Sequence, residues 1–310
     1  MAPKIVMNSR SNLPLREVYE EFVFSRKVQG CTETTVQNYK DRIHNVSKYL
    51  DIEMPLCSLT KRHLEEMICQ MRDAGLAHNT IASYVRSLRT FLLWCSKEGL
   101  TDVIIPQIRE RETVKQTYSD EDLELLLKRP KANCEFGEFR DWVIVNFLMN
   151  CGCRASTVRN IQIQDVDLER RQIVFRHNKN GRVQTVPLCS SMVTILNEYM
   201  RIRRGKMDDY LFCNIYGGML TENALRLAIV HYNRRRGVQM TSIHAFRHTF
   251  AKKYLIDCGG NAFTLQRLLG HSTLEMTKRY CAVFDADVAK SFDTFSPLEH
   301  LKREQIKKRK

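Results

Sequence analysis

The sequence has no apolar run with a length of about 18 residues, the length that a membrane-spanning helix needs. A mean hydropathy of −0.37 likewise argues against a membrane span. The opening stretch, MAPKIVMNSRSNLPL, lacks the long apolar core of a secretory signal. There is no phosphate-binding loop of the nucleotidase type, no GxGxxG after a strand, no HExxH and no cluster of carboxylates suited to two metal ions. We therefore expect a soluble intracellular protein that uses no nucleotide, no metal and no other cofactor.

The cysteine pattern excludes a disulfide framework. Eleven cysteines are scattered along the chain, an odd number, and Cys69, Cys95 and Cys281 fall in apolar stretches. No CxxC pair exists, and Cys151 and Cys153 are separated by one residue, which is a poor spacing for a structural zinc site. The pattern indicates reduced thiols, most of them buried.

Basic residues are in excess. The chain has 49 Lys and Arg against 35 Asp and Glu, a net charge of +14, which favours nucleic acid or an anionic membrane surface as partner. An apolar content of 43% excludes a disordered basic tail protein. Residues 1–116 carry 17 basic and 14 acidic side chains, whereas residues 117–310 carry 32 and 21, including six basic residues in the last nine. The surplus therefore lies in the second part.

The length of 310 residues predicts two domains. Residues 101–116, TDVIIPQIRERETVKQ, break the helical pattern at Pro106 and predict a linker. Before it, helical apolar spacing predicts four helices and no strand. These are Leu15 to Lys27, a helix capped by Thr32 and running to Leu50, Lys61 to Ala74, and a helix capped by Asn79 and ending at Gly99.

The part after residue 116 is predicted to be mostly helical with one hairpin. Ser119 starts a helix, and 136–150 is apolar almost all round and therefore buried. Strands are predicted at 171–177 and 182–188, joined through Asn180 and Gly181. Further helices are predicted near 190–203, 222–235, 244–257, 262–269 and 273–281.

Three segments of this second part hold side chains suited to chemistry. MNCGCRAST places Arg154 after the buried helix and Gly152, at a helix start whose N–H groups favour anions. VFRHNKNGRVQTVPL presents Lys179 at the hairpin turn. The segments TSIHAFRHTF and LLGHSTLEMTKRY supply His244, Arg247, His271 and Tyr280.

Each of these residues alone has a structural explanation, such as a helix cap, a solvated pair or a core tyrosine. Together, two arginines, a lysine, two histidines and a tyrosine are the groups needed to transfer a phosphoryl group to a phenol. Arginine forks bind two phosphate oxygens and stabilise the more highly charged transition state. Lysine or histidine can protonate a leaving alkoxide, and tyrosine can form the covalent intermediate.

The order and separations of these blocks resemble the tyrosine recombinase family, which contains phage integrases and Xer-like proteins. The matching blocks, over about residues 13–296, are GCR, Asp165 in QIQDVD, the Lys179 hairpin ending in VPL, HAFRH, LLGH and TKRY. The resemblance implies a mainly α fold: a helical, SAM-like core-binding domain at 13–100 and a mixed α/β catalytic domain at 117–298. The two would form a clamp around DNA, followed by a basic C-terminal tail at 299–310.

The resemblance also implies roles. Tyr280 would attack a scissile phosphate and form a 3′-phosphotyrosyl link, with Arg154 and Arg247 binding the phosphate and His271 donating to a non-bridging oxygen. Lys179 would protonate the 5′ oxygen, and His244 would assist proton movement at the tyrosine. Four protomers on two double-stranded DNA sites with inverted repeats would exchange strands through a Holliday junction without ATP. The C-terminal segment would dock on a neighbouring protomer.

One position departs from the family. Glu usually stands three residues after the first arginine, but this chain has Thr157. Three roles remain open: an integrase or transposase of a mobile element, which Thr157 and the basic extension favour; a Xer-type recombinase for chromosome dimers; and a DNA-binding regulator that does not cut. A type IB topoisomerase shares the chemistry but matches the series of blocks less well.

Two basic clusters could follow phosphates by releasing counterions. They are the cluster 201–206 and the run 234–236, with Arg201, Arg203, Arg204, Arg234, Arg235 and Arg236. A solvated helix end explains either cluster equally well. Accessory DNA-bending proteins are possible partners and a membrane is not. We expect a bacterial cytoplasmic protein associated with the nucleoid.

Overall fold

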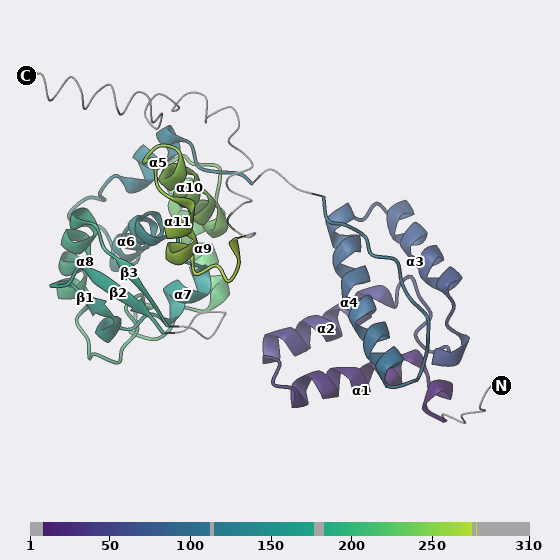
Figure 1. The fold of residues 1–310 in the computed structure, drawn as a ribbon. Helices are drawn as coiled ribbons and strands as arrows, with labels where there is room; N and C mark the ends of the chain where they lie inside the picture. Colours follow the sequence, from purple (N-terminus) through teal and green to yellow (C-terminus); the bar gives the residue numbers. More distant parts are fainter. Residues whose placement is uncertain (1–8, 112–114, 177–182, 275–276, 278–310) are drawn as a thin grey trace, which may run out of the picture. The chain divides into compact units, whose positions relative to one another are not determined.

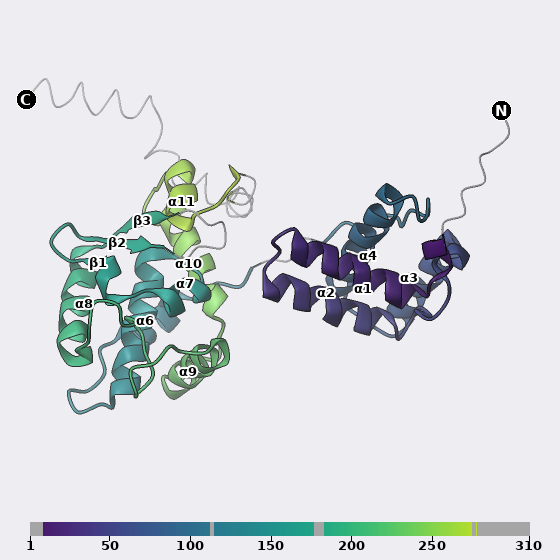
Figure 2. The same ribbon diagram turned by 90° about the horizontal axis from the view of Figure 1, so that it is seen from below.

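The computed structural model describes residues 9–111, 115–176, 183–274 and 277. The chain divides into two compact units, Met1–Thr113 and Val114–Lys310 (Figures 1 and 2). The division falls inside the segment expected to be a linker. In the described part of the chain, no helix is long and apolar enough to cross a membrane.

The first unit is helical. It contains α1 (Leu15–Val28), α2 (Glu33–Val46), α3 (Lys61–Asp73) and α4 (His78–Lys97), with short 3-10 turns at Ser9–Asn12 and Leu56–Ser58. Its core includes a cluster of aromatic rings from α1, α2 and α4, with centroids 4.9 to 6.5 Å apart. Phe22 and Phe91 are completely buried in this cluster. The apolar spacing of the sequence therefore identified the helices by the faces that pack together.

Two of the predicted helix ends in this unit are wrong. Thr32 caps α2 as predicted, since its hydroxyl accepts from the Thr35 N–H, but α2 ends at Val46. Leu50 remains buried beyond that end, so its apolar character reflects the core and not the helix. Asn79 does not cap α4, because its amide pairs with both backbone groups of Arg111 at 2.9 and 3.1 Å.

The expected linker is in large part integral to the first unit. Ile105 is completely buried, and its carbonyl accepts a hydrogen bond from Arg89 of α4 at 2.7 Å. The His78 ring is bonded to the Arg109 carbonyl at 2.9 Å. The segment up to Arg111 thus packs along α4, because its apolar residues have a helix face to cover. Pro106 marks the absence of helix and not a loose connection.

The second unit surrounds one buried helix. Its elements are α5 (Asp120–Leu127), α6 (Phe136–Cys151), α7 (Ala155–Asn160), β1 (Val166–Asp167), β2 (Gln172–Phe175), β3 (Gln184–Pro187), α8 (Ser190–Arg203), α9 (Glu222–Arg235), α10 (Ile243–Leu255) and α11 (Ala262–Leu269). Helix α6 packs against α5, α8, α9 and α10, which confirms the predicted burial (Figure 1). Ser119 caps α5 as predicted.

Helix α6 also buries a charged pair. Arg140 and Asp141 form two hydrogen bonds of 2.7 and 2.9 Å, and Arg140 donates to the Cys213 carbonyl. Burial raises the pKa of Asp141, and the guanidinium of Arg140 opposes this shift. The pair satisfies both side chains inside the core, so the continuous burial of α6 is compatible with its two charges.

The sheet is antiparallel, in the order β1–β2–β3. Ile173 is opposite Val186, and both are completely buried. The two-residue strand β1 was not predicted, because it is too short to show an alternating pattern. The predicted turn Asn180-Gly181 lies outside the described residues.

The prediction that most cysteines are buried is only partly correct. None of the ten described cysteines forms a disulfide; Cys95, Cys151, Cys153 and Cys213 are buried, and four others are exposed. The exposed cysteines lie on helix and loop surfaces. Because the cysteine side chain is small, it fits on a surface as well as in a core, and its presence in the sequence does not indicate burial. Cys151 in α6 donates its S–H to the Phe147 carbonyl, and burial raises its pKa.

Candidate active site

The turn between α6 and α7 requires glycine and provides a carbonyl to the site. Gly152 ends α6 with φ +58°, a left-handed conformation. A Cβ on this residue would overlap the Phe250 ring and would lie 2.9 Å from a methyl group of Leu269. The next residues bring Arg154 to the N-cap of α7, as the sequence predicted. Side chains of α10 and α11 therefore pack directly against the end of α6, two residues before Arg154.

Arg247 is the buried centre of this convergence. Its side chain projects from α10, and the residue is only 6% exposed. Nη1 donates to the Gly152 carbonyl at 2.9 Å, and Nη2 donates to the Leu269 carbonyl at 3.0 Å. These partners are neutral, so they fix the position of the guanidinium without cancelling its charge. Such a fixed cation is suited to bind an anion.

His271 lies against this guanidinium. It follows Gly270, which ends α11 with φ +62°. Nε2 is 2.8 Å from Nη2 of Arg247, and Nδ1 is 2.8 Å from the hydroxyl of Thr277. Burial, followed by the charges of Arg247 and Arg154, lowers the pKa of His271 to about 4. Arg154, Arg247 and His271 thus share one electrostatic environment, and the ring is neutral at pH 7.

The two histidines of α10 differ in burial. His244, the candidate from the sequence, is exposed, whereas His248 one turn later is half-buried. Burial, and then the charges of Lys115, His244 and Arg247, lower the pKa of His248 to about 4. His248 therefore belongs to the surroundings of the site. Its four-residue spacing from His244 was the available sequence signal.

Gln184 links the sheet to the histidine segment. Its amide nitrogen donates to the carbonyls of Arg267 and Leu268, at 2.7 and 2.8 Å, so β3 is joined to the end of α11 (Figure 2). Sequence reasoning missed Gln184 and Thr277, because a polar residue near a strand end or before a tyrosine carries no distinctive pattern. Lys179 and Tyr280 lie outside the described residues.

Thr157, which replaces the usual glutamate, is buried in α7. It lines the same small pocket as Asp165 and Arg176. Asp165 is 3% exposed, accepts from Arg176 Nε at 2.6 Å, and also accepts from the Gln162 N–H at 2.9 Å. A buried carboxylate is therefore present in this region although residue 157 has none.

The six arginines considered for DNA binding fall into two groups. Arg203 donates twice to the Tyr210 carbonyl, and the guanidinium of Arg236 lies 4.4 Å from the centroid of the Tyr232 ring. Both side chains are largely buried, at 5% and 15% exposure. Arg201, Arg204, Arg234 and Arg235 are exposed. The contacts of the first two favour a structural role, and the exposed four remain candidates for phosphate contact.

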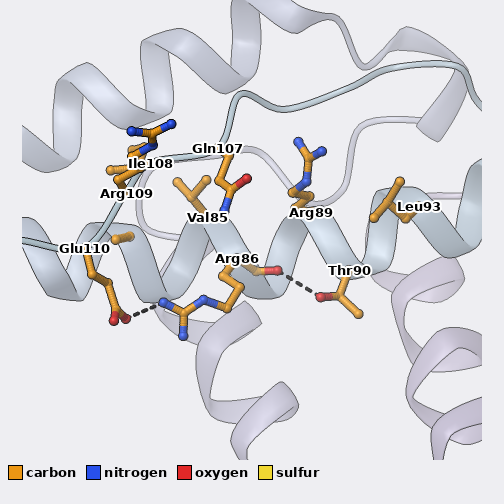
Figure 3. Close-up of a pocket in the computed structure, with 10 residues that line it drawn as sticks. Val85, Arg86, Arg89, Thr90, Leu93, Gln107, Ile108, Arg109 and Glu110 are labelled. Atoms are coloured by element: carbon orange, nitrogen blue, oxygen red, sulfur yellow. Dashed lines mark hydrogen bonds and ion pairs between the residues drawn. The ribbon is translucent and has the colours of Figure 1, made fainter. Parts of the chain in front are cut away.

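The first unit has a separate hollow of about 450 Å³ between α4 and the segment 107–110. Figure 3 shows Arg86 directed at Glu110, with which it forms an ion pair, while Arg89 and Arg109 also line the hollow. Among the described candidates, Arg154, His244, Arg247 and His271 do not line this hollow. Because Arg86 and Arg89 both bind the returning segment, this hollow is the junction that holds the segment to α4.

Comparisons with known proteins identify the family. The model of the phage integrase family matches residues 116–287, and that of the phage integrase N-terminal SAM-like domain matches residues 19–99. The chain belongs to the phage integrase family. Its members are tyrosine recombinases, site-specific DNA recombinases that serve in integrase or Xer-type roles.

One relative of this tyrosine recombinase is the tyrosine recombinase XerA of Pyrococcus furiosus. The two are 26% identical over 291 residues, which cover 92% of this chain and 96% of the relative. The fold resembles the Tn1549 transposon integrase in complex with transposon right end DNA, with a TM-score of 0.71, 19% identity and coverage of 92% and 99%. It also resembles a lambda integrase tetramer bound to a Holliday junction, with a TM-score of 0.71, 14% identity and coverage of 90% and 81%.

Proposed function

We propose that the second unit cleaves and rejoins DNA strands through a covalent bond between Tyr280 and a 3′ phosphate. The observation that carries this proposal is the buried Arg247 guanidinium, fixed by two carbonyls and in contact with His271. A phosphodiester oxygen placed beside it meets a cation whose position two backbone carbonyls already fix. Arg154, whose charge also acts on His271, supplies the second arginine of the phosphate site.

The reaction forms one bond and breaks one. The Tyr280 oxygen bonds to phosphorus, and the bond between phosphorus and the 5′ oxygen breaks. The phenol proton passes toward His244, and the leaving 5′ oxygen takes a proton from Lys179. Arg154, Arg247 and His271 bind the non-bridging oxygens. Because the phosphotyrosyl bond conserves the energy of the phosphodiester, a 5′-hydroxyl from a partner duplex reverses the step without ATP.

The partner is double-stranded DNA with inverted-repeat core sites, and the active assembly is a tetramer on two sites. The Holliday-junction-bound tetramer of lambda integrase, a protein of similar fold, supports this assembly. In our proposal the C-terminal segment is exchanged between protomers, the two units clamp the DNA, and accessory DNA-bending proteins assist. The assembly acts in the bacterial cytoplasm, on the nucleoid.

Among biological roles we propose recombination of a mobile element, as its integrase or transposase. Thr157, the basic C-terminal extension and the similarity in fold to the Tn1549 transposon integrase support this role. The 26% identity to XerA supports the alternative of chromosome-dimer resolution. A circular excised product from cells that carry the flanking DNA distinguishes the two, because dimer resolution requires no excision.

A suicide substrate tests the proposed chemistry. The duplex comes from the DNA flanking the gene and is nicked near the cleavage position, so that the released fragment diffuses away. We expect a denaturant-resistant protein–DNA adduct with the wild type and none with Tyr280→Phe. Arg247→Lys, which keeps the charge but loses the forked donor geometry, should slow adduct formation by at least about a hundredfold.

Two other outcomes would change the assignment. Equal adducts from wild type and Tyr280→Phe would place the nucleophile elsewhere. Tight, sequence-specific binding without an adduct from either protein would favour the non-catalytic regulator.

A further inference from the structure

The hydrogen bonds of His271 define which ring nitrogen carries its proton. An arginine side chain has only donors, so Nε2 of His271 accepts from Nη2 of Arg247 across their 2.8 Å contact. In a neutral imidazole the proton then resides on Nδ1. Nδ1–H donates to the hydroxyl oxygen of Thr277, also at 2.8 Å. The DNA-free site therefore contains the Nδ1–H tautomer.

This tautomer is the wrong one for the proposed reaction. To bind a non-bridging phosphate oxygen, His271 must donate from Nε2, the atom that accepts from Arg247 here. The ring could gain a second proton, or it could move its one proton from Nδ1 to Nε2. Burial and the adjacent charges of Arg247 and Arg154 disfavour a second proton. The neutral route is therefore favoured.

Thr277 is the residue that makes the neutral route possible. A hydroxyl both accepts and donates, so it can accept from Nδ1–H in one state and donate to a bare Nδ1 in the other. Thr277 is completely buried, which removes water as an easy substitute partner. It also precedes the proposed nucleophile Tyr280 by three residues in the sequence. The imidazole is thereby tied to the segment that carries the tyrosine.

We propose that Thr277 is a positioning residue whose hydroxyl reverses the direction of its hydrogen bond to His271 when DNA binds. The reversal occurs when a phosphate oxygen replaces Nε2 of His271 as the acceptor of the Arg247 hydrogen bond. The half-buried ring exchanges protons with solvent, losing one from Nδ1 and gaining one at Nε2, so the step has no net proton uptake. Arg247 turns its Nη2–H to the phosphate, and His271 becomes a donor to the same group. This inference rests on the proposed function for the phosphate and on the described contacts for the free state.

Two substitutions separate the hydroxyl from the shape of the side chain. Thr277→Val keeps the volume and removes both donor and acceptor, whereas Thr277→Ser keeps the hydroxyl. Adduct formation on the suicide duplex should be at least about tenfold slower in Thr277→Val, because a wrong tautomer or orientation of the imidazole is costly to catalysis. Thr277→Ser should remain within about threefold of wild type, and DNA affinity should not change in either variant, because backbone phosphate contacts dominate it.

Nitrogen NMR of histidine-labelled full-length protein reads the tautomer directly, with His271→Gln assigning the signal. At pH 7 we expect a proton on Nδ1 in the free wild type and in Thr277→Ser. With Tyr280→Phe bound to the uncleaved duplex, we expect a neutral ring with the proton on Nε2. In the same DNA complex, Thr277→Val should lose the single Nε2–H form, because no hydroxyl then donates to the bare Nδ1.

Three results would overturn the proposal: an Nε2–H or charged ring in the free wild type, a charged ring in the DNA complex, or Thr277→Val equal to wild type in tautomer and rate. If Thr277→Val does not fold, the wild-type and Thr277→Ser spectra still decide. If the wild type forms no adduct at all, the proposed function fails while the free-state spectra continue to test the role of Thr277.

Discussion

The amide oxygen of Gln184 lies 2.6 Å from the point where a Cβ on Gly270 would stand. The same amide donates from its nitrogen to the carbonyls of Arg267 and Leu268, so the close approach is part of the attachment of β3 to α11. A glycine before His271 is therefore required twice, by its φ of +62° and by the side chain that occupies its missing Cβ. This contact fixes the position of His271 relative to β3.

Gly270→Ala should destabilise the second unit by about 2–4 kcal/mol, the sum of a left-handed alanine and displacement of Gln184. Gly237→Ala is the matched control, because Gly237 has φ +78° but an open space at its Cβ position. The control should lose only about 1 kcal/mol. Urea unfolding measures both, and equal losses would show that the Gln184 contact contributes nothing.

The stability of the second unit should depend on acid through two histidines. The folded pKa values of His271 and His248 are lowered to about 4, so the unfolded chain binds more protons below the ordinary histidine pKa of about 6.5. The free energy of unfolding is therefore fully present above pH 7 and falls as pH decreases toward 4, by on the order of 2 kcal/mol per histidine.

His271→Gln and His248→Gln should each flatten this slope in urea titrations between pH 7 and 4. The exposed His231 on α9 provides the control, and His231→Gln should leave the slope as in wild type. A slope unchanged in both test variants would contradict the lowered pKa values.

Asp165→Asn should destabilise the second unit by about 1–3 kcal/mol, because it weakens a buried acceptor of both Arg176 and the Gln162 N–H. Asp167→Asn is the control in the adjoining strand, where the carboxylate is more exposed, accepts from the Arg170 N–H at 2.8 Å and lies 3.8 Å from Nε of Arg170. We expect less than about 1 kcal/mol there. Chemical denaturation compares the two, and a larger loss for Asp167→Asn would refute the assignment.

Substitutions of the exposed arginines should affect DNA binding, whereas substitutions of the buried arginines should affect stability. Arg201→Ala and Arg235→Ala should weaken DNA binding and lower the dependence of log Kd on log salt by about 1 for each phosphate that the variant no longer neutralises, without changing the melting temperature. Arg203→Ala should lower the melting temperature instead, because it removes the two bonds to the Tyr210 carbonyl. Anisotropy titrations at several salt concentrations, with thermal melts, measure both. An unchanged salt slope in the exposed variants would exclude them from the DNA interface.

Much of the helical framework was predictable because its signals are local. Helical apolar spacing predicted α1 and α3, and a stretch that is apolar almost all round predicted α6. The hydroxyls of Thr32 and Ser119 cap their helices where expected. Helix ends at Leu50 and Asn79 were wrong, because a core contact and a bond to Arg111 decide them. Such contacts join residues distant in the sequence, where periodicity carries no information.

The catalytic candidates show the same limit. The spacing of the motifs selected Arg154, Arg247 and His271, and their shared environment is consistent with that selection. The burial of His248 beside the site, in contrast to the exposure of His244, follows from which side of α10 packs inward.

By itself the sequence determined the residue types of the site, their order and the helices that carry them. Side-chain chemistry belongs to each residue, and the periodicity of apolar residues depends only on neighbours in the sequence. Only the tertiary structure decided that Gly152 and Leu269 offer their carbonyls to one guanidinium, and that the hydroxyl of Thr277 faces His271. Those contacts arise where three helices and a strand converge. The direction of each hydrogen bond and the burial of each side chain there depend on distances between segments that are far apart in the sequence, and the spacing of residues along the chain does not specify these distances.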